Sequence, residues 1–298
     1  ISGDVTNHAT AEQFEIARKF VSGVIDAFGL TGRRCLLTPG NHDLSWDEEV
    51  YQWQPTRRVN TEKLPEGSWR KEGQGYLIRN EKQYPRRFRR YSEGFHHKLT
   101  HEAYPSDYEA QGASYLFPDD HLQFLTLNSC WEIDEFFRER SGLHPAAVAK
   151  GLDEADRQLK QHSLKADDVL RIGVWHHPVT GNEKMENTSF VEQLRKAKFR
   201  LTLHGHVHED RTGLVGYKYG RTMHVAGAGS FGVWVEDRPP STPQLYNLIE
   251  VNRDLRSIKV HTRYKDNEDG AWGGRAIWPG PDKHTKCTFY TVRLFKST

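Results

Sequence analysis

The sequence has few cysteines, and their spacing excludes two kinds of scaffold. Only three are present among 298 residues, at Cys35, Cys130 and Cys287. Small disulfide-rich domains and zinc ribbons both need closely spaced cysteine pairs, which this sequence lacks. We therefore expect three reduced, mostly buried thiols.

The sequence also lacks a long apolar run and an excess of one charge. No run approaches the length of a membrane span, and the mean hydropathy is −0.79. Lysine and arginine total 42 against 40 acidic residues, so the formal charge of +2 gives no strong signal for nucleic acid or membrane partners. We expect a cytoplasmic protein. No signal peptide is visible, but the sequence starts at Ile1 without a methionine, so an upstream leader stays open.

What is present indicates a layered α/β protein. Ile1 and Ser2 resemble the end of a buried strand that turns at Gly3 and Asp4. Residues 11–30 repeat apolar side chains at helical spacing, and residues 34–43 (RCLLTPGNHD) form another short apolar run ending in a glycine-containing loop. This strand, helix, strand order is typical of layered α/β folds, and polar residues follow each strand.

The rest of the chain favours one domain, 1–298, with an inserted cap. Residues 44–113 show no clean period and are expected to form the cap over the site. Residues 113–130 predict two strands, residues 145–161 a helix, and residues 169–178 and 199–208 two strands that end in histidines. Residues 221–298 predict short strands of a second sheet or its edge.

Four short motifs at predicted strand ends carry candidate metal ligands: Asp4 in GD, Asn41 and His42 in GNHD, His176 and His177 in HHP, and His206 and His208 in GHVH. Carboxylate, amide oxygen and imidazole together suit Mn, Fe, Zn, Ni or Co. Taken singly, each motif has an ordinary alternative, such as a turn for Gly-Asp or a strand end for HHP. Their joint order after apolar strands favours a metal site.

The order GD, GNHD, HHP, GHVH resembles the calcineurin-like metallophosphoesterase superfamily, from Gly3 to His208. The resemblance implies a four-layer α/β/β/α sandwich of two mixed β-sheets flanked by helices. It also implies two divalent metal ions at the strand ends and hydrolysis of phosphate esters by a hydroxide that the two ions activate.

The resemblance also assigns roles to individual residues. It makes Asp4 the bridging carboxylate, Asn41, His176 and His206 ligands of one ion, and His208 a ligand of the other. His42 matches the residue that contacts the phosphate and assists the leaving group. His177 and Asp43 are expected to face the substrate or to support the ligands.

One family motif is not found. Members begin with a strand that carries Asp-x-His, and no such motif precedes Gly3. We therefore expect that the N-terminal strand is missing, that one ion keeps only Asp4 and His208 as protein ligands, and that the chain as given is impaired.

The cap contains a basic run, YPRRFRRYSEGFHHK, at residues 84–98. Arg86 and Arg87 in particular are candidates to bind substrate phosphates, and nearby tryptophans are candidates to stack on a base. The alternative is a solvated basic face over a helix whose apolar side packs, which the helical spacing of Phe88, Tyr91 and Phe95 favours.

The leading functional hypothesis is hydrolysis of phosphodiesters such as cyclic nucleotides, because the HHP form and the compact spacing resemble the bacterial cyclic-nucleotide phosphodiesterase branch. The partner is then a phosphate-ester small molecule or nucleotide. The alternatives are a phosphomonoesterase, a nuclease, or a catalytically silent metal-binding regulatory module.

Overall fold

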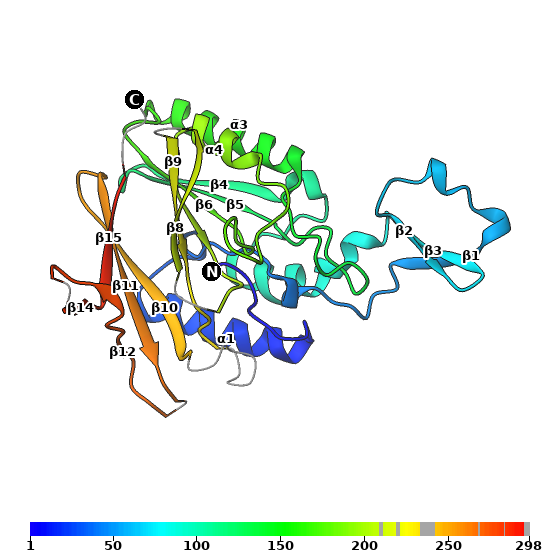
Figure 1. Cartoon of the computed structure of the whole chain (residues 1–298), viewed down its shortest axis with the longest axis horizontal. Coiled ribbons are helices and arrows are strands. Elements are labelled where there is room, and N and C mark those ends of the chain that lie inside the picture. The colour runs from blue at the N-terminus through cyan, green and yellow to red at the C-terminus, as the bar shows by residue number, and fades with distance from the viewer. Residues whose placement is uncertain (209–210, 219–220, 233–241, 268, 283, 295–298) are drawn as a thin grey trace.

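The largest element of the fold is a six-stranded mixed sheet (Figure 1). The structure is a computed structural model that describes residues 1–208, 211–218, 221–232, 242–267, 269–282 and 284–294. The strand order is β4-β5-β6-β7-β9-β8. The four central strands, β5, β6, β7 and β9, run parallel to one another. The edge strands run antiparallel to their neighbours, β4 to β5 and β8 to β9. The bounds are β4 (Gly112–Phe117), β5 (Leu122–Leu127), β6 (Leu170–Val174), β7 (Phe199–His204), β8 (Arg211–Lys218) and β9 (Arg221–Gly227).

A second sheet packs against one face of the first. It contains β10 (Gln244–Val251), β11 (Ser257–Lys265), β12 (Gly273–Gly274) and β15 (Phe289–Arg293), with β11 at its centre. Ile172 and Leu201 of the first sheet share a buried cluster with Ile258 and Val260 of the second. A separate two-stranded ladder joins β13 (Trp278–Pro279) and β14 (Lys286–Cys287).

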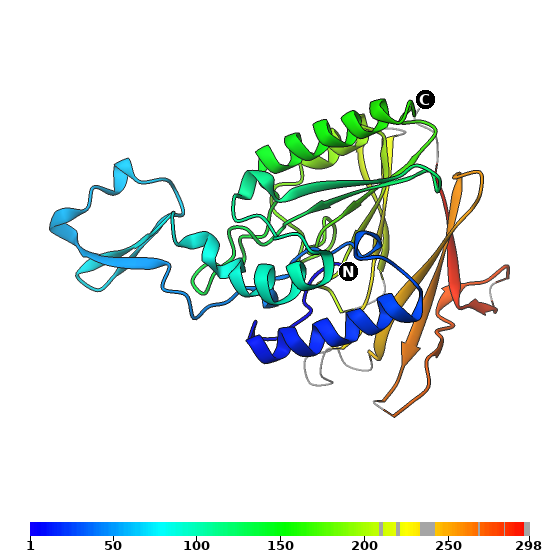
Figure 2. The ribbon, with the colours of Figure 1, turned by 180° about the vertical axis from the view of Figure 1, so that it is seen from behind.

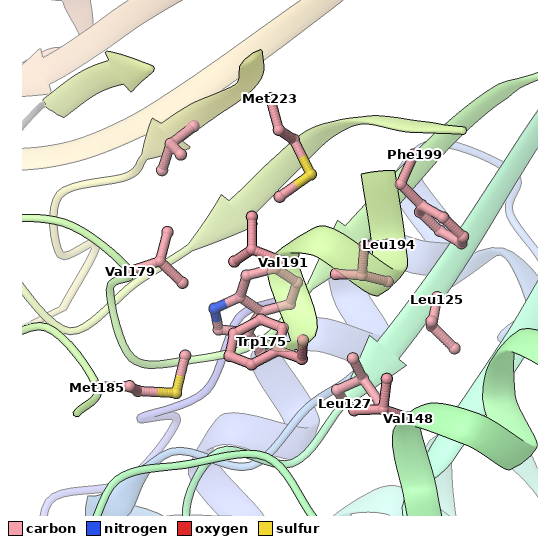
Figure 3. Packing of buried hydrophobic residues seen from close by; sticks show 12 residues of the cluster. Leu125, Leu127, Val148, Trp175, Val179, Met185, Val191, Leu194, Phe199 and Met223 are labelled. Atoms are coloured by element: carbon pink, nitrogen blue, oxygen red, sulfur yellow. The ribbon is translucent and has the colours of Figure 1, made fainter. Parts of the chain in front are cut away.

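Helices α3 (Pro145–Gln161) and α4 (Phe190–Lys196) cover the other face of the six-stranded sheet. Pro145 occupies the first turn of α3, where its missing N–H costs no hydrogen bond. Figure 3 shows the buried cluster between these layers, in which Val148 and Leu194 from the helices surround Trp175. Because Trp175 directly follows β6 and is fully buried, this cluster fixes the position of the next residues, His176 and His177.

Helix α1 (Ala11–Ala27) lies on the opposite side of the molecule from α3 (Figure 2). The hydroxyl of Thr10 caps it by accepting a hydrogen bond from the N–H of Gln13 at 3.3 Å. Its buried Phe14 and Val21 pack with Tyr91 and other residues of the inserted segment. The predicted α/β class is thus confirmed, with β-sheets and helices packed in layers.

Two details of the prediction need correction. The paired strands of the second sheet are all antiparallel in the described ranges, so only the six-stranded sheet is mixed. Strand β9, predicted within the second sheet, pairs in parallel with β7 of the first. Its Met223 and Val225 face the helices while Ala226 faces the second sheet, and such burial on both faces is typical of an interior parallel strand. Residues 233–241, 268, 283 and 295–298 of this predicted strand region lie outside the described residues.

The inserted segment has two parts. Strands β1 (Tyr51–Pro55), β2 (Trp69–Glu72) and β3 (Gly75–Arg79) form an antiparallel sheet that projects from the body, on the right of Figure 1. The helical turns that follow, η5 (Tyr84–Phe88), η6 (Tyr91–His96) and α2 (His97–Thr100), return to the body. Phe88, Tyr91 and Phe95 are buried there, which confirms the predicted packing of the apolar side. A single domain with a cap over the site stays a prediction.

Short turns complete the described chain: η1 (Gly32–Arg34), η2 (Asn41–Asp43), η3 (Thr56–Arg58), η4 (Thr61–Lys63) and η7 (Tyr108–Ala110). All three cysteines are free, with Cys130 buried and Cys35 and Cys287 half-buried. No helix in the described ranges is long and apolar enough to cross a membrane.

Candidate metal centre

The first two motifs are brought together by a short strand-like contact at the N-terminus. Ser2 and Thr38 form a parallel bridge, and the N–H of Thr38 donates to the carbonyl oxygen of Ile1 at 3.1 Å. Gly3 then turns with φ +88°, and a Cβ atom placed there would lie 2.5 Å from the backbone nitrogen of Gly40. Only glycine permits this close approach, which places Asp4 beside the GNHD turn.

Four of the predicted ligands meet at one point. The Nε2 atom of His176 lies 3.0 Å from Oδ2 of Asp4, 3.1 Å from Oδ1 of Asn41 and 3.3 Å from Nδ1 of His206. Asp4 and Asn41 come from the two loops at the N-terminus, and the two histidines follow β6 and β7. The predicted convergence of these donor atoms is confirmed, whereas their role as ligands stays a prediction.

The chemistry of this group fits a cation. The Nδ1 atom of His176 lies 2.6 Å from the carbonyl oxygen of Ser2, which can only accept, so Nδ1 carries the hydrogen. A neutral His176 then turns the lone pair of Nε2 toward the oxygens of Asp4 and Asn41, and these lone pairs would repel one another. Oδ2 of Asp4 is buried and receives no well-directed hydrogen bond from the described residues. A divalent ion with nitrogen and oxygen ligands would satisfy all of these groups.

The backbone of this group is strained. Asp4, His206 and His208 have positive φ angles of 54°, 70° and 51°. Non-glycine residues in this region cost about 1–3 kcal/mol each, and such strain is concentrated at functional sites. The folded chain therefore maintains an unfavourable backbone where the candidate ligands meet.

Electrostatics favour a carboxylate at Asp4 and neutral imidazoles at His206 and His208. Burial alone would raise the pKa of Asp4, but the adjacent His176 lowers it below its usual value. Burial would lower the pKa of His176, and the carboxylate of Asp4 raises it instead. Burial, together with the charge of His176, lowers the pKa of His206 to about 4, and burial also lowers the pKa of His208. Neutral imidazoles are the form that binds metals.

The comparison with known proteins supports the same chemistry. The family description "Calcineurin-like phosphoesterase" matches residues 1–210 of the 298 residues. The chain belongs to the calcineurin-like phosphoesterase family. Membership supports metal-dependent hydrolysis of phosphate esters in general terms.

Individual relatives are distant. The chain is 22% identical over 291 residues to the "Uncharacterized metallophosphoesterase-like protein YydB" of Bacillus subtilis (strain 168), with 94% of this chain and 55% of the relative covered. The chain thus spans about half the length of this curated relative. Among solved structures, a single mutant of Vps29 from Entamoeba histolytica matches 42% of this chain and 55% of its own, with 17% identity and a TM-score of 0.24.

His42, the candidate catalytic residue of this calcineurin-like phosphoesterase, is oriented by its neighbours. Its backbone N–H donates to Oδ1 of Asp4 at 3.0 Å, and its Nδ1 lies 3.0 Å from the carbonyl oxygen of Asn7. Because that carbonyl can only accept, Nδ1 carries hydrogen and Nε2 is the free edge of an exposed ring. This exposure separates His42 from the buried histidines behind it.

Asp43 is fully buried and supports the ligand loops. Its Oδ1 accepts hydrogen bonds from the N–H groups of Val5 and Thr6, each at 3.0 Å, and its Oδ2 accepts one from the N–H of Gly40 at 2.9 Å. Burial and the nearby carboxylate of Asp4 raise the pKa of Asp43 to about 7. Asp43 thereby joins the GD and GNHD loops into one unit.

His177 belongs to the same histidine group. His176, His177 and His206 each offer a donor atom within 4.8 Å of the others. Nδ1 of His177 lies 2.9 Å from the hydroxyl oxygen of Ser129. The sequence analysis did not identify Ser129 as a site residue. Ser129 follows β5 in the segment Asn128-Ser129-Cys130, which carries no recognisable motif.

The two arginines assigned to phosphate binding do not share one role. Arg87 is fully buried, and its guanidinium donates to the carbonyl oxygens of Tyr84, Trp131 and Ile133. The prediction that Arg87 binds substrate is therefore wrong, because backbone carbonyls occupy its donors. Arg86 is half-exposed and lies 3.5 Å from the carboxylate of Glu48, so it forms part of a solvated charged face.

Proposed function

We propose that this chain carries the catalytic site of a metal-dependent phosphoesterase that acts on phosphodiesters such as cyclic nucleotides. The observation that carries the proposal is the meeting of a carboxylate, an amide oxygen and a second imidazole at Nε2 of His176. Family membership supports the reaction class. The substrate class follows from the sequence resemblance alone.

The residues divide between two ions. Asp4, Asn41, His176 and His206 would hold one, and Asp4 with His208 would contribute to the other. When bound, such ions neutralise the charge of the ester and lower the pKa of water toward 7. Mn, Fe, Zn, Ni and Co all suit these donors.

Two sites with unequal protein ligands should bind with unequal affinity. Titration of the purified chain with Mn²⁺ should show one tight equivalent and a much weaker second one, because Asp4 and His208 are the only protein ligands assigned to the second. Two equally tight equivalents would show that an unassigned residue completes the second site.

His42 is proposed to act as the imidazolium, with hydrogens on both ring nitrogens, and to donate the Nε2 proton, or a hydrogen bond, to the departing oxygen. Its ring is exposed, and Asn7 holds Nδ1 so that Nε2 is free for the substrate. His42→Ala should therefore lower turnover far more than metal content, whereas Asn41→Ala should lower both. Equal loss of metal in the two variants would mean that their roles are reversed.

The substrate preference is tested with a matched pair of esters. Turnover of bis-p-nitrophenyl phosphate above that of p-nitrophenyl phosphate supports a diesterase, and the reverse order supports the phosphomonoesterase alternative. Cleavage of oligonucleotides but not of cyclic nucleotides would support a nuclease. Metal binding without turnover of any ester would favour the silent regulatory module. A cytoplasmic location also stays a prediction.

A further inference from the structure

The two adjacent histidines after β6 hold their ring hydrogens on different nitrogens. For His176 the reason is the carbonyl oxygen of Ser2, 2.6 Å from Nδ1. A carbonyl cannot donate, so Nδ1 is the protonated nitrogen of the neutral ring and Nε2 carries the lone pair. This is the arrangement in which histidine binds metals through Nε2.

For His177 the partner is a hydroxyl whose other bonds decide its direction. Oγ of Ser129 lies 2.9 Å from Nδ1 of His177. The same oxygen accepts the backbone N–H groups of His176 at 3.2 Å and of His177 at 3.0 Å. A hydroxyl has two lone pairs and one hydrogen. Because both lone pairs are occupied, Ser129 donates its hydrogen to Nδ1, and the ring hydrogen of His177 must lie on Nε2.

The opposite assignment fits the surroundings poorly. If Nδ1 of His177 carried the hydrogen, it would give Ser129 a third hydrogen bond to accept or point at the sulfur of Cys130, 3.8 Å away. Sulfur is a weak acceptor, and the thiol of Cys130 is itself directed at the carbonyl of Pro39 at 3.6 Å. Ser129 and Cys130 are both fully buried, so solvent offers no alternative partner.

Nε2 lies across the ring from Nδ1, so the protonated edge of His177 is turned away from Ser129, and the ring as a whole lies within the histidine group. Its ring lies 4.5 Å from the ring of His206, centroid to centroid. Within the part of the chain that the structure describes, the hydrogen bonds of this ring involve Nδ1 only. Nε2–H is therefore available to an acceptor bound at the centre.

We propose that His177 is not a metal ligand but a hydrogen-bond donor, through Nε2–H, to an oxygen of a phosphate group bound at the metal centre. Ser129 is the positioning residue that fixes this tautomer. The identity of the acceptor rests on the proposed function, whereas the tautomer rests on the hydrogen bonds alone. His177 thus supplies a fixed dipole next to the ligand His176.

The first test measures the tautomer directly, in the unmodified full chain. ¹⁵N NMR of the imidazole groups, without metal and loaded with Zn²⁺, should show a protonated Nε2 for His177 and a protonated Nδ1 for His176. His177→Gln assigns the signals by their disappearance. A His177 ring with its hydrogen on Nδ1 would overturn the proposal.

The second test separates ligand from donor. His177→Leu should bind the first Zn²⁺ within about threefold of the unmodified chain, whereas His176→Leu should lose at least about a hundredfold. Inorganic phosphate should bind the Zn²⁺-loaded His177→Leu chain about tenfold more weakly, as expected for one lost hydrogen bond. Ser129→Ala should weaken phosphate binding and populate the other tautomer, and Ser129→Thr, which keeps the hydroxyl, should restore both.

The outcomes are distinguishable from those of the proposed function. Loss of the first zinc equivalent in a folded His177→Leu chain would make His177 a ligand and refute the proposal. A chain with the expected tautomer and phosphate binding that hydrolyses no ester would refute the phosphoesterase assignment and leave the role of His177 intact.

Discussion

Gly3→Ala, a change of one methyl group, should reduce metal binding strongly. A Cβ at this position would lie 2.5 Å from the nitrogen of Gly40 and 2.7 Å from Nδ1 of His176. Real Cβ contacts start near 3.0 Å, so the loops must separate by at least 3.0 minus 2.5, or 0.5 Å. Metal ligands tolerate displacements of only about 0.2 Å. We therefore expect Mn²⁺ affinity to fall about 10- to 100-fold.

Gly29→Ala is the matched control. Gly29 also has a positive φ, of 59°, but an added Cβ would meet nothing within 4 Å. The backbone cost common to both changes is about 1 kcal/mol, and the contacts at Gly3 add about 1–3 kcal/mol. Isothermal titration with Mn²⁺ and guanidinium unfolding should thus separate the variants in both affinity and stability. Equal metal affinity in the two variants would refute the claim that contact between the loops positions Asp4.

Three further outcomes follow from packing, protonation and ligand binding. Phe14→Ala should lower the free energy of unfolding by about 3–5 kcal/mol, because Phe14 is buried. Phe28→Ala, at a side chain that is 74% exposed, should change it by less than about 0.5 kcal/mol. Similar values for the two variants would show that α1 does not pack as described. Burial lowers the pKa of His96, so the unfolded chain takes up a proton at this group first, and stability should fall as the pH drops through 6.5. In urea unfolding, His96→Gln should reduce this pH dependence, and an unchanged dependence would contradict the assignment. Mn²⁺ at about 100 times its dissociation constant should raise the free energy of unfolding by about 2.7 kcal/mol and raise Tm accordingly, an increase that a chelator should abolish.

The convergence of the site was predictable because local sequence rules governed it. Apolar runs before His176 and His206 indicated strand ends, and β6 and β7 present those ends at one edge of the six-stranded sheet. The segments before Asp4 and Asn41 were also predicted as strands, but they form only an isolated bridge between Ser2 and Thr38. Pro145 and the apolar spacing after it likewise marked the start of α3. These features depend on neighbours within a few residues, which is the range over which sequence patterns are informative.

Other features depended on contacts that no local pattern encodes. The place of β9 follows from burial on both faces, and its pairing with β7 joins segments that the sequence reading assigned to different sheets. Arg87 belongs to a basic run that indicated a binding surface, yet it lies in the interior. The carbonyl oxygens of Trp131 and Ile133 on a distant loop, and that of Tyr84 in its own helical turn, accept its hydrogen bonds. Ser129 belongs to no recognisable motif. Its role depends on hydrogen bonds from the backbone N–H groups of His176 and His177, which are 47 and 48 residues away along the chain.

The most direct test of the metal centre is the position of a bound ion. Crystals of the chain grown with Mn²⁺ should show an anomalous scattering peak about 2.0–2.3 Å from the facing side-chain atoms of Asp4, Asn41, His176 and His206. The ion would take the place between atoms that now lie 3.0–3.3 Å from Nε2 of His176. A peak at another place, or no peak there at saturating Mn²⁺, would contradict the assignment of these four residues as ligands.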